Sequence, residues 1–242
     1  MTSYDLGMNT SGGLGQYIRV PSGWVVRKPA GLTLRESMIF GTAGFTAALS
    51  VLRLVDFGLQ KPDEILVTGA GGGVGGVAVS MLSHSGFKVT ALNNLIDEKE
   101  YLTKIGAEKV IEPSEFIDES GRPLLKEQWT GCVDTLGGSA LSSAIRSVRA
   151  NGAVTCCGNV ISPDLNLTVY PFILRGVSLF GIDSQNCPMP RRVRAWEMLA
   201  GPWKFSWLEN LASEVRLGEV NDAIEKIKSG SHRGRFIVNL WD

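Results

Sequence analysis

Six of the eight residues from Gly69 to Gly76 are glycine, and this run constrains the fold of the chain more than any other feature. An apolar, β-branched segment, residues 64–68, precedes the run, and residues 74–85 after it carry apolar side chains at helical spacing. Glycines between a strand and a helix permit a tight turn, let an anion approach the backbone amides, and let the helix pack closely on the strand. The amides and the dipole at the start of the helix attract the anion. The run therefore predicts a diphosphate-binding loop.

The glycines fit the diphosphate motif in two registers. Gly71, Gly73 and Gly76 match G-x-G-x-x-G literally. A second register places a glycine at every third residue, starting from Gly69. A glycine-rich turn that binds no ligand is the third interpretation. The candidate binding residues of the loop are Gly71, Gly72, Gly73, Val74 and Gly75.

Strand and helix patterns alternate over residues 64–183. Short β-branched runs predict strands, and longer segments with apolar residues at helical spacing separate them. The predicted strands cover residues 64–68, 88–92, 109–111, 132–134, 153–157 and 177–181, and the predicted helices cover residues 74–85, 99–105 and 140–148. Strand, crossover helix and strand repeated in this way indicate a parallel sheet with helices on both faces. The predicted fold class is therefore α/β, with a doubly wound parallel sheet.

The two ends of the chain have different patterns. Residues 1–34 show no helical period, and residues 15–20 are strand-like. Residues 34–54 predict a helix that is interrupted at Gly41 and Gly44. The C-terminal part predicts helices near residues 192–199 and 220–228 and a closing strand at residues 235–240.

The residues after the second predicted strand decide which dinucleotide such a loop takes. An acidic residue there would bind the ribose diol of NAD, and an arginine would accept the 2′-phosphate of NADP. The chain has Leu92-Asn93-Asn94-Leu95 at this point, and Asp97 and Lys99 follow beyond the expected tip. The two asparagines suit either ribose hydroxyls or a phosphate, or they only close the strand as a polar turn. This segment therefore does not decide between NAD and NADP. Arg191 and Arg192 are the first candidates if a distant basic residue reads a phosphate.

Composition and charge exclude several classes of protein. Twenty-four Lys and Arg balance 24 Asp and Glu, which argues against a nucleic-acid binder. The most apolar stretch, residues 39–52, is shorter than the ~20 residues of a membrane span. The N-terminus lacks the pattern of a signal peptide, which predicts a cytoplasmic location. The four cysteines form no C-x-x-C pair and neither histidine lies in a ligand-like pattern, so we expect no metal site.

Four motifs together resemble one family. The segments 41–47, 68–75, 170–177 and 181–184 (GTAGFTA, TGAGGGVG, YPFILRGV and GIDS) occur in the order and spacing typical of zinc-independent medium-chain dehydrogenase/reductases. Within that branch the chain resembles the acryloyl-CoA reductase family, whose members are often called quinone oxidoreductases. The similarity covers essentially the whole chain.

The resemblance implies two domains. A Rossmann nucleotide-binding domain would cover residues 35–189. A partial GroES-like, β-rich catalytic domain would combine residues 1–34 with the C-terminal return, residues 190–242. The first ~80 residues of that domain, with its Asn-Tyr-Lys-Asp segment, are expected to be missing, so no catalytic residue is assigned.

The resemblance also implies an activity and further site residues. The first hypothesis is an NAD(P)H-dependent reductase of an activated C=C bond, in an acryloyl-CoA-like thioester or a quinone or enone. The second is a catalytically incomplete fragment that retains at most cofactor binding. The expected cofactor is NADPH, with NADH possible, and the expected partners are a small-molecule substrate and a second copy joined through the edge strand of the Rossmann sheet. Besides the glycine loop, the matched cofactor positions are Asn93, Asn94, Leu95, Asn159, Ile173 and Ser184.

Overall fold

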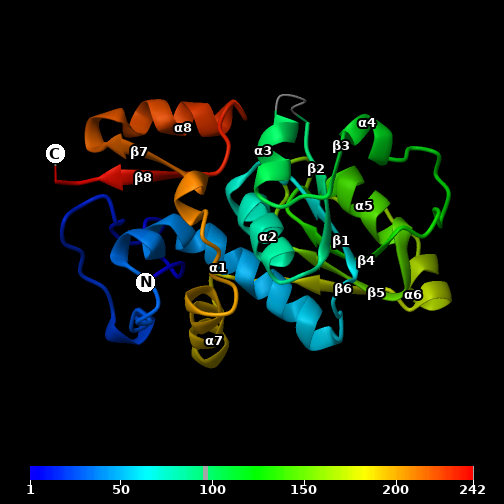
Figure 1. The fold of residues 1–242 in the computed structure, drawn as a ribbon, viewed down its shortest axis with the longest axis horizontal. Helices are drawn as coiled ribbons and strands as arrows, with labels where there is room; N and C mark the ends of the chain where they lie inside the picture. Colours follow the sequence, from blue (N-terminus) through cyan, green and yellow to red (C-terminus); the bar gives the residue numbers. More distant parts are fainter. Residues whose placement is uncertain (95–97, 242) are drawn as a thin grey trace.

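Six parallel strands form the sheet at the centre of the molecule, as the computed structural model shows for residues 1–94 and 98–241, the residues that it describes (Figure 1). The order across the sheet is β3-β2-β1-β4-β5-β6. The strands are β1 Glu64–Thr68, β2 Lys88–Leu92, β3 Lys109–Ile111, β4 Trp129–Asp134, β5 Val148–Cys156 and β6 Ser178–Gly181. This is the order of a doubly wound dinucleotide-binding sheet, and it confirms the predicted fold class.

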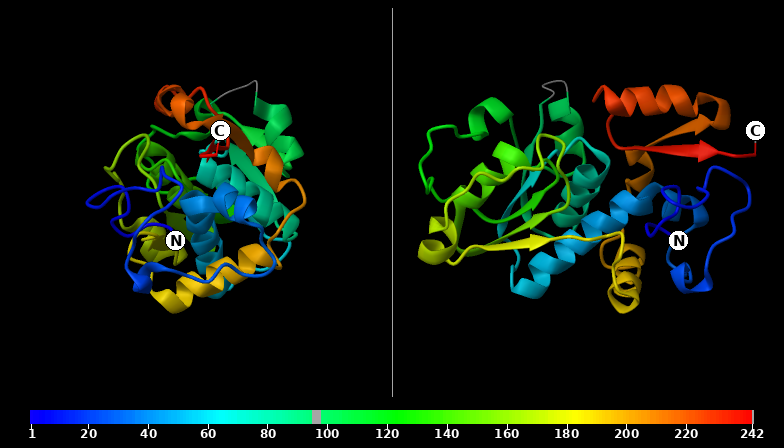
Figure 2. Two further views of the ribbon diagram at one scale, coloured as in Figure 1. Left: turned by 90° about the vertical axis from the view of Figure 1, so that its left-hand side faces the viewer. Right: turned by 180° about the vertical axis from the view of Figure 1, so that it is seen from behind.

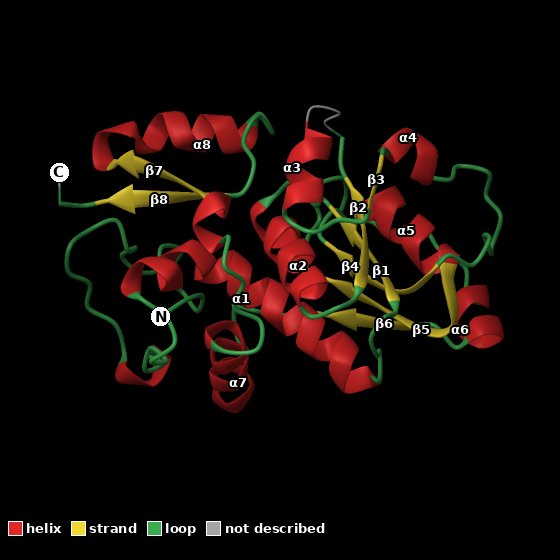
Figure 3. Ribbon diagram, in the orientation of Figure 1, coloured by secondary structure: helices red, strands yellow, loops and turns green. Residues whose placement is uncertain are grey.

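Helices cover both faces of the sheet because its strands are apolar on both sides (Figure 3). On β1, Ile65 and Val67 pack into a cluster with α1 and α2, whereas Leu66 packs on the opposite face with α5. The helices are α1 Leu34–Phe57, α2 Gly73–His84, α3 Lys99–Lys104, α4 Pro113–Phe116, α5 Gly138–Ser147, α6 Tyr170–Arg175, α7 Met189–Ala200 and α8 Val220–Lys228, and short 3-10 turns lie at Ser22–Trp24, Leu208–Leu211 and Leu217–Glu219. The sequence did not predict α4 and α6.

Helix α1 is the longest element and it has a kink. A capping box starts it, in which the Thr33 side chain and the Glu36 amide are paired, and Gly58 ends it in the left-handed conformation. Gly41 interrupts it with φ 48° and ψ −151°, as predicted, whereas Gly44 is helical. With 24 residues, α1 is long and apolar enough to cross a membrane, which the fourteen-residue stretch did not suggest. However, 72% of its apolar window is buried inside the molecule, as in the core helix of a soluble protein.

The C-terminal part forms a small unit of its own. Strands β7 Ala212–Arg216 and β8 Arg235–Asn239 pair in parallel, and α8 connects them. Strand β8 confirms the predicted closing strand, whereas β7 was not predicted because its polar sequence, ASEVR, carries one large apolar residue. Figure 2 shows that β8 and the N-terminal coil lie at the same end of the molecule, beyond the central sheet.

Residues 15–20 correct one prediction, because they form coil and not a strand. A strand needs a neighbouring backbone to satisfy its amides and carbonyls. This segment instead meets the end of the chain through a side chain, since Gln16 Nε2 donates to the carbonyl oxygen of Leu240 at 2.9 Å. The proposed division into residues 1–34, 35–189 and 190–242 remains a prediction.

Candidate functional site

The glycine loop leaves the start of α2 open to an anion. Gly69 turns the chain with φ 61°, and the Gly72 amide donates to the Gly69 carbonyl oxygen at 3.0 Å. Gly72 is the N-cap of α2 and has no side chain that could cap the first amides of the helix. The unpaired amides in the first turn of α2 and the positive end of its dipole therefore face the same space beside the glycine loop.

The loop glycines have separate roles, which the two registers of the motif left undecided. A Cβ atom at Gly75 would collide with the Gly69 carbonyl oxygen and lie 2.8 Å from the Ala70 Cα atom, so Gly75 allows α2 to pack against β1. At Gly72 a Cβ atom would meet only the Gly69 carbonyl oxygen, at 3.3 Å. These positions match the three glycine roles of a dinucleotide loop. Gly69 makes the tight turn, Gly72 leaves room for a diphosphate to approach the backbone, and Gly75 lets the helix pack on the strand. The geometry therefore fits the register with a glycine at every third residue.

Asp134 joins the carboxyl ends of β1 and β4 below this loop. Its Oδ1 atom accepts from the Thr68 hydroxyl at 2.7 Å, and its Oδ2 atom accepts from the Gly137 amide at 2.9 Å. Burial raises the pKa of Asp134, and these hydrogen bonds oppose that rise. Sequence reasoning missed this residue, although its position at the end of a predicted strand was a usable signal. The pair fixes the sheet at the point where strand order reverses, which is where ligands bind in open α/β sheets.

A carboxylate lies beside the loop at the end of β2. Glu98 is 7% exposed, and its Oε2 atom accepts from Asn93 Nδ2 at 2.6 Å. A Cβ atom at Gly71 would collide with the same oxygen. Sequence reasoning missed Glu98 because it lies five positions after Asn93, beyond the segment that was considered. Asn94 is exposed at this edge, and Leu95 lies outside the described residues.

The three other predicted positions do not come together at one place. Asn159 follows β5 at the carboxyl edge, where its Cα atom would be 3.1 Å from a Cβ atom of Gly137. Ser184 follows β6 and lines a cavity of about 690 Å³ between the two ends of the chain. Ile173 lies on α6, which precedes the amino end of β6, and it is 67% exposed. The structure therefore brings Asn159 and Ser184 to the carboxyl edge and leaves Ile173 at the opposite edge (Figure 1).

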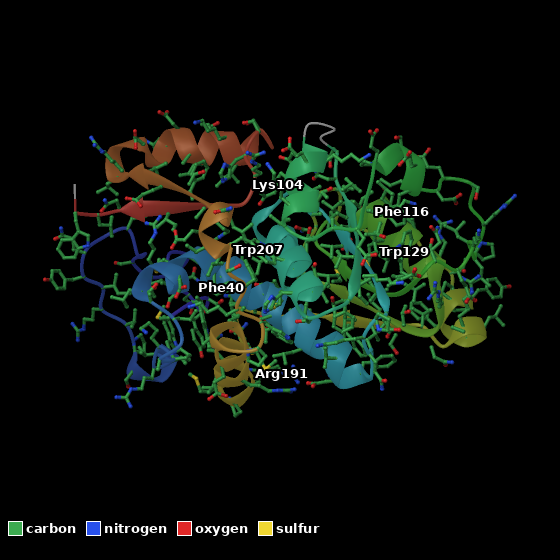
Figure 4. All side chains as sticks on the ribbon, in the orientation of Figure 1. Phe40, Lys104, Phe116, Trp129, Arg191 and Trp207 are labelled. Carbon is green, nitrogen blue, oxygen red and sulfur yellow. The ribbon has the colours of Figure 1, made fainter. Side chains whose placement is uncertain are left out.

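Arg191 and Arg192 lie away from the end of β2, which corrects the suggestion that one of them reads a phosphate there. Arg192 is 1% exposed and donates to the carbonyl oxygens of Thr2 and Ser184. Arg191 lines a separate cavity beside β6. In Figure 4, Arg191 lies below α1, on the other side of the molecule from Lys104 of α3.

The C-terminal strand β8 reaches the glycine loop, which no local pattern predicted. The Gly234 amide donates to the Gly71 carbonyl oxygen at 3.0 Å. The next side chain, Arg235, lies against Gly73, where a Cβ atom would be 2.9 Å from its Cδ atom. Burial lowers the pKa of the Arg235 guanidinium. The site is therefore built from the central sheet on one side and from residues near the C-terminus on the other.

Metal ligands do not cluster in residues 1–94 and 98–241. Among them, no three His, Cys, Asp or Glu side chains are grouped so that they could hold a metal ion. All four cysteines are free, and burial raises the pKa of the Cys157 thiol to about 12.

One protein family matches this chain by its sequence. The family described as "Zinc-binding dehydrogenase" matches residues 73–200, which include α2 and the strands from β2 to β6. In the described part of this chain, no His, Cys, Asp or Glu side chains are grouped so that they could hold the zinc ion that this description names.

Individual relatives match over nearly all of the chain. "Putative quinone oxidoreductase YhfP" of Bacillus subtilis is 44% identical over 241 residues, which are 99% of this chain and 73% of YhfP. "Acrylyl-CoA reductase AcuI" of Ruegeria pomeroyi is 38% identical over 241 residues, again 99% of this chain and 73% of the relative. The chain thus spans about three quarters of the length of these relatives.

Solved structures agree with the fold. The crystal structure of Bacillus subtilis yhfP with NAD bound has a TM-score of 0.96 and 44% sequence identity to this chain. The match covers 99% of this chain and 73% of the yhfP chain. The structure of E. coli K-12 YHDH with bound NADPH has a TM-score of 0.95 and 40% sequence identity to this chain. The match covers 99% of this chain and 74% of the YHDH chain.

Proposed function

The chain belongs to the acryloyl-CoA reductase and quinone oxidoreductase family of medium-chain dehydrogenase/reductases, and from this we propose that it is an NAD(P)H-dependent oxidoreductase that reduces an activated C=C bond. The substrate class is an acryloyl-CoA-like thioester or a quinone or enone. The observation that carries the proposal is the uncapped start of α2 behind Gly69, Gly72 and Gly75, each of which has one of the three roles of a dinucleotide loop.

The residues of the chain have defined tasks in this reaction. The amides at the start of α2 bind the diphosphate, and Asp134 with Thr68 holds the carboxyl edge of the sheet in position. Bound reduced nicotinamide would supply the hydride. The cavity lined by Thr42, Ser184 and Arg235 offers room for the substrate beside the loop. Orientation of the two reactants in this cavity is the main contribution of the protein.

Cofactor choice depends on the end of β2. Related proteins were crystallised with NAD and with NADPH. In this chain the buried Glu98 carboxylate lies between Asn93 and Gly71, where a Rossmann domain holds the ribose of adenosine. A carboxylate accepts hydrogen bonds from a ribose diol and repels a 2′-phosphate. We infer that NADPH and NADH both bind and that any preference for NADPH is weak.

A second candidate function is cofactor binding without turnover. It is favoured by large apolar side chains that residues 1–34 expose to solvent, since unpaired apolar surface marks a missing contact. The most exposed are Tyr17 at 88%, Leu34 at 76% and Met8 at 70%.

Two measurements test the proposal. Calorimetric titration with NADH and NADPH should show binding, and the nicotinamide absorbance should then fall when acryloyl-CoA or a quinone is added. Binding without turnover on either substrate class would support the second candidate. Absence of binding by either dinucleotide would contradict both.

Assembly and location belong to the same proposal. Strand β6 lies at an edge of the six-stranded sheet, and an open edge invites pairing with another chain. We infer a homodimer in which the β6 strands of two copies join.

The four free cysteines suit a reducing compartment, which supports the cytoplasm.

A further inference from the structure

Another cavity lies beside β6, apart from the cavity that offers room for the substrate. Its volume is about 320 Å³, and its lining comes from α1, β6 and the start of α7. Leu49, Leu52 and Phe180 form an apolar part of this lining, whereas Arg53 and Arg191 form a basic part (Figure 4). Apolar walls with a few polar groups are typical of small-molecule sites. The tasks described above leave this cavity without a role.

The two arginines are exposed, and each lacks a countercharge of its own. Within residues 1–94 and 98–241, neither Arg53 nor Arg191 forms an ion pair or a hydrogen bond. Both lie near Asp56, whose pKa is lowered mainly by hydrogen bonds from Arg194 and further by the charges of these two arginines. The guanidinium of Arg53 lies over the ring of Phe180, with 4.2 Å between its Cζ atom and the ring centroid. This contact keeps the side chain at the cavity.

The two carboxylates that line the cavity have hydrogen-bond donors elsewhere. Asp56 accepts two hydrogen bonds from Arg194, each at 2.7 Å. The Oδ1 atom of Asp183 accepts from the backbone amides of Gln185 and Asn186 at 2.8 and 2.9 Å. The cavity therefore keeps two guanidinium groups that no carboxylate binds.

Two unpaired guanidinium groups at one cavity are stabilised when an anion lies between them. The planar guanidinium matches phosphate oxygens, to which it can donate two parallel hydrogen bonds. The apolar part of the lining suits the uncharged part of a larger molecule. The cavity thus fits a phosphate group that is attached to an organic ligand.

Residues 183–192 separate this cavity from the larger one. Asp183 and Arg191 of the segment line the cavity beside β6, whereas Ser184 and Arg192 line the cavity of about 690 Å³. A ligand that is longer than either cavity can therefore place one end in each.

We propose that Arg53 and Arg191 form a subsite for the phosphate groups of a CoA thioester, whose acyl end occupies the larger cavity. The inference rests on the proposed function, because it takes the thioester from the two substrate classes named there. CoA carries its phosphates and its thioester at opposite ends of a long pantetheine arm, whereas a quinone or a simple enone carries no phosphate. The subsite therefore favours the thioester over the other substrate class.

Calorimetry with CoA tests the assignment, with NADH at saturation so that the dinucleotide site is occupied. The double variant Arg53→Gln, Arg191→Gln should bind CoA about tenfold more weakly than the parent, because charge-assisted hydrogen bonds are lost. Arg122→Gln is the matched control, since Arg122 is exposed between α4 and β4, and its affinity for CoA should equal that of the parent. The affinity for NADH should be the same in all three proteins, which shows that the variants are folded.

Two smaller ligands show which part of CoA the arginines bind. Pantetheine lacks the phosphates, so the parent and the double variant should bind it with equal affinity. Inorganic phosphate lacks the organic part, so the parent should bind it more weakly than CoA at the same ionic strength. If the parent binds phosphate as tightly as CoA, the cavity takes a free anion and the assignment to CoA is wrong.

The outcomes separate this inference from the proposed function. Equal affinity of the parent and the double variant for CoA would overturn the subsite, and so would a parent that binds NADH but no CoA. In both cases the proposed function stands if a quinone or an acryloyl thioester oxidises the bound NADH. If the parent binds neither NADH nor NADPH, the proposed function itself is wrong, whereas binding of CoA that depends on the two arginines would still support the subsite.

Discussion

Gly72 and Gly75 lie three residues apart in one loop, but their surroundings differ. Gly72 has φ −76° and ψ 173°, which any residue can adopt, and the space beside it is largely open. At Gly75 a Cβ atom would strike the backbone of Gly69 and Ala70. Gly75 therefore serves the packing of α2 on β1, and we expect Gly72 to serve the approach of the ligand.

We predict that Gly72→Val folds but loses dinucleotide binding, because the valine side chain fills the space beside the amides. Circular dichroism should show the parent's melting midpoint, and calorimetry should show at least tenfold weaker binding of NADH. Gly75→Val should instead lower the midpoint. Unchanged affinity in a folded Gly72→Val variant would contradict the assignment of this loop.

The Glu98 carboxylate makes cofactor choice testable at a single residue. Glu98→Gln removes a negative charge from the place where a 2′-phosphate would lie, so the affinity for NADPH should rise relative to that for NADH. We expect the ratio of the two dissociation constants to change about tenfold, which corresponds to about 1.4 kcal/mol. Glu100→Gln is the matched control, because Glu100 is exposed and paired with Lys104. Equal ratios in the two variants would show that Glu98 does not face the phosphate.

At the scale of elements, the kink of α1 depends on one backbone conformation. Gly41 has φ 48° and ψ −151°, a combination that side chains with a Cβ atom rarely adopt. The kink lets the first turns of α1 run beside the C-terminal unit while the rest packs on the central sheet.

Gly41→Ala should lower the free energy of unfolding by about 1–3 kcal/mol, the usual cost of such backbone strain. Urea denaturation measures the change. Gly23→Ala is the control, since Gly23 is exposed with nothing within 4 Å of its Cβ position, and it should have the stability of the parent. A Gly41→Ala variant as stable as this control would show that α1 can straighten without cost.

We expect His232 to make the docking of β8 sensitive to pH. Its ring stacks on Phe236 with 3.6 Å between centroids, and burial lowers the pKa of its imidazole below the usual value of 6.5. The unfolded chain therefore binds a proton at a higher pH than the folded chain does. Stability is fully present above pH 6.5 and falls as the pH decreases toward the folded pKa.

The prediction for His232 compares how far the melting midpoints of the parent and of one variant fall at low pH. Between about pH 7.5 and pH 5.5, the pH range around its ordinary pKa, the melting midpoint of His232→Gln should fall less than that of the parent. Equal falls would exclude His232 as a source of the pH dependence.

At the scale of the whole molecule, β6 is the open edge of the central sheet on the side of β5. Phe180 of this strand packs against Phe57 of α1, and the side chain of Arg53 lies over its ring at 4.2 Å. This packing supports the strand from within, and its outer backbone edge is where the proposed second copy would pair in a symmetric two-fold contact.

Light scattering across a dilution series should show a dimer that dissociates at low concentration. Leu179→Lys should shift the equilibrium to the monomer, provided that its melting curve shows a folded protein. A parent chain that behaves as a 26.1 kDa monomer at micromolar concentration would contradict the edge-to-edge arrangement without any variant.

The sequence by itself determined the central sheet and the glycine loop, because both depend on short-range patterns. Apolar runs, helical spacing and glycines between strand and helix are local, and they predicted the six strands of the sheet. The same reasoning was wrong for residues 15–20, since pairing of a strand depends on a neighbour that local sequence does not show. It also missed β7, whose few apolar residues gave no periodic signal.

Only the tertiary structure decided which side chains meet at the loop. Glu98 contacts Gly71 from 27 positions further along the chain, and Arg235 contacts Gly73 from 162 positions further along. Ile173 shows the converse, since a matching motif placed it in the site and the fold leaves it on α6 at the other edge of the sheet. The physical reason is that local patterns report which face of an element is buried, whereas a site forms where distant segments pack against one another, and that is determined by the topology of the whole chain.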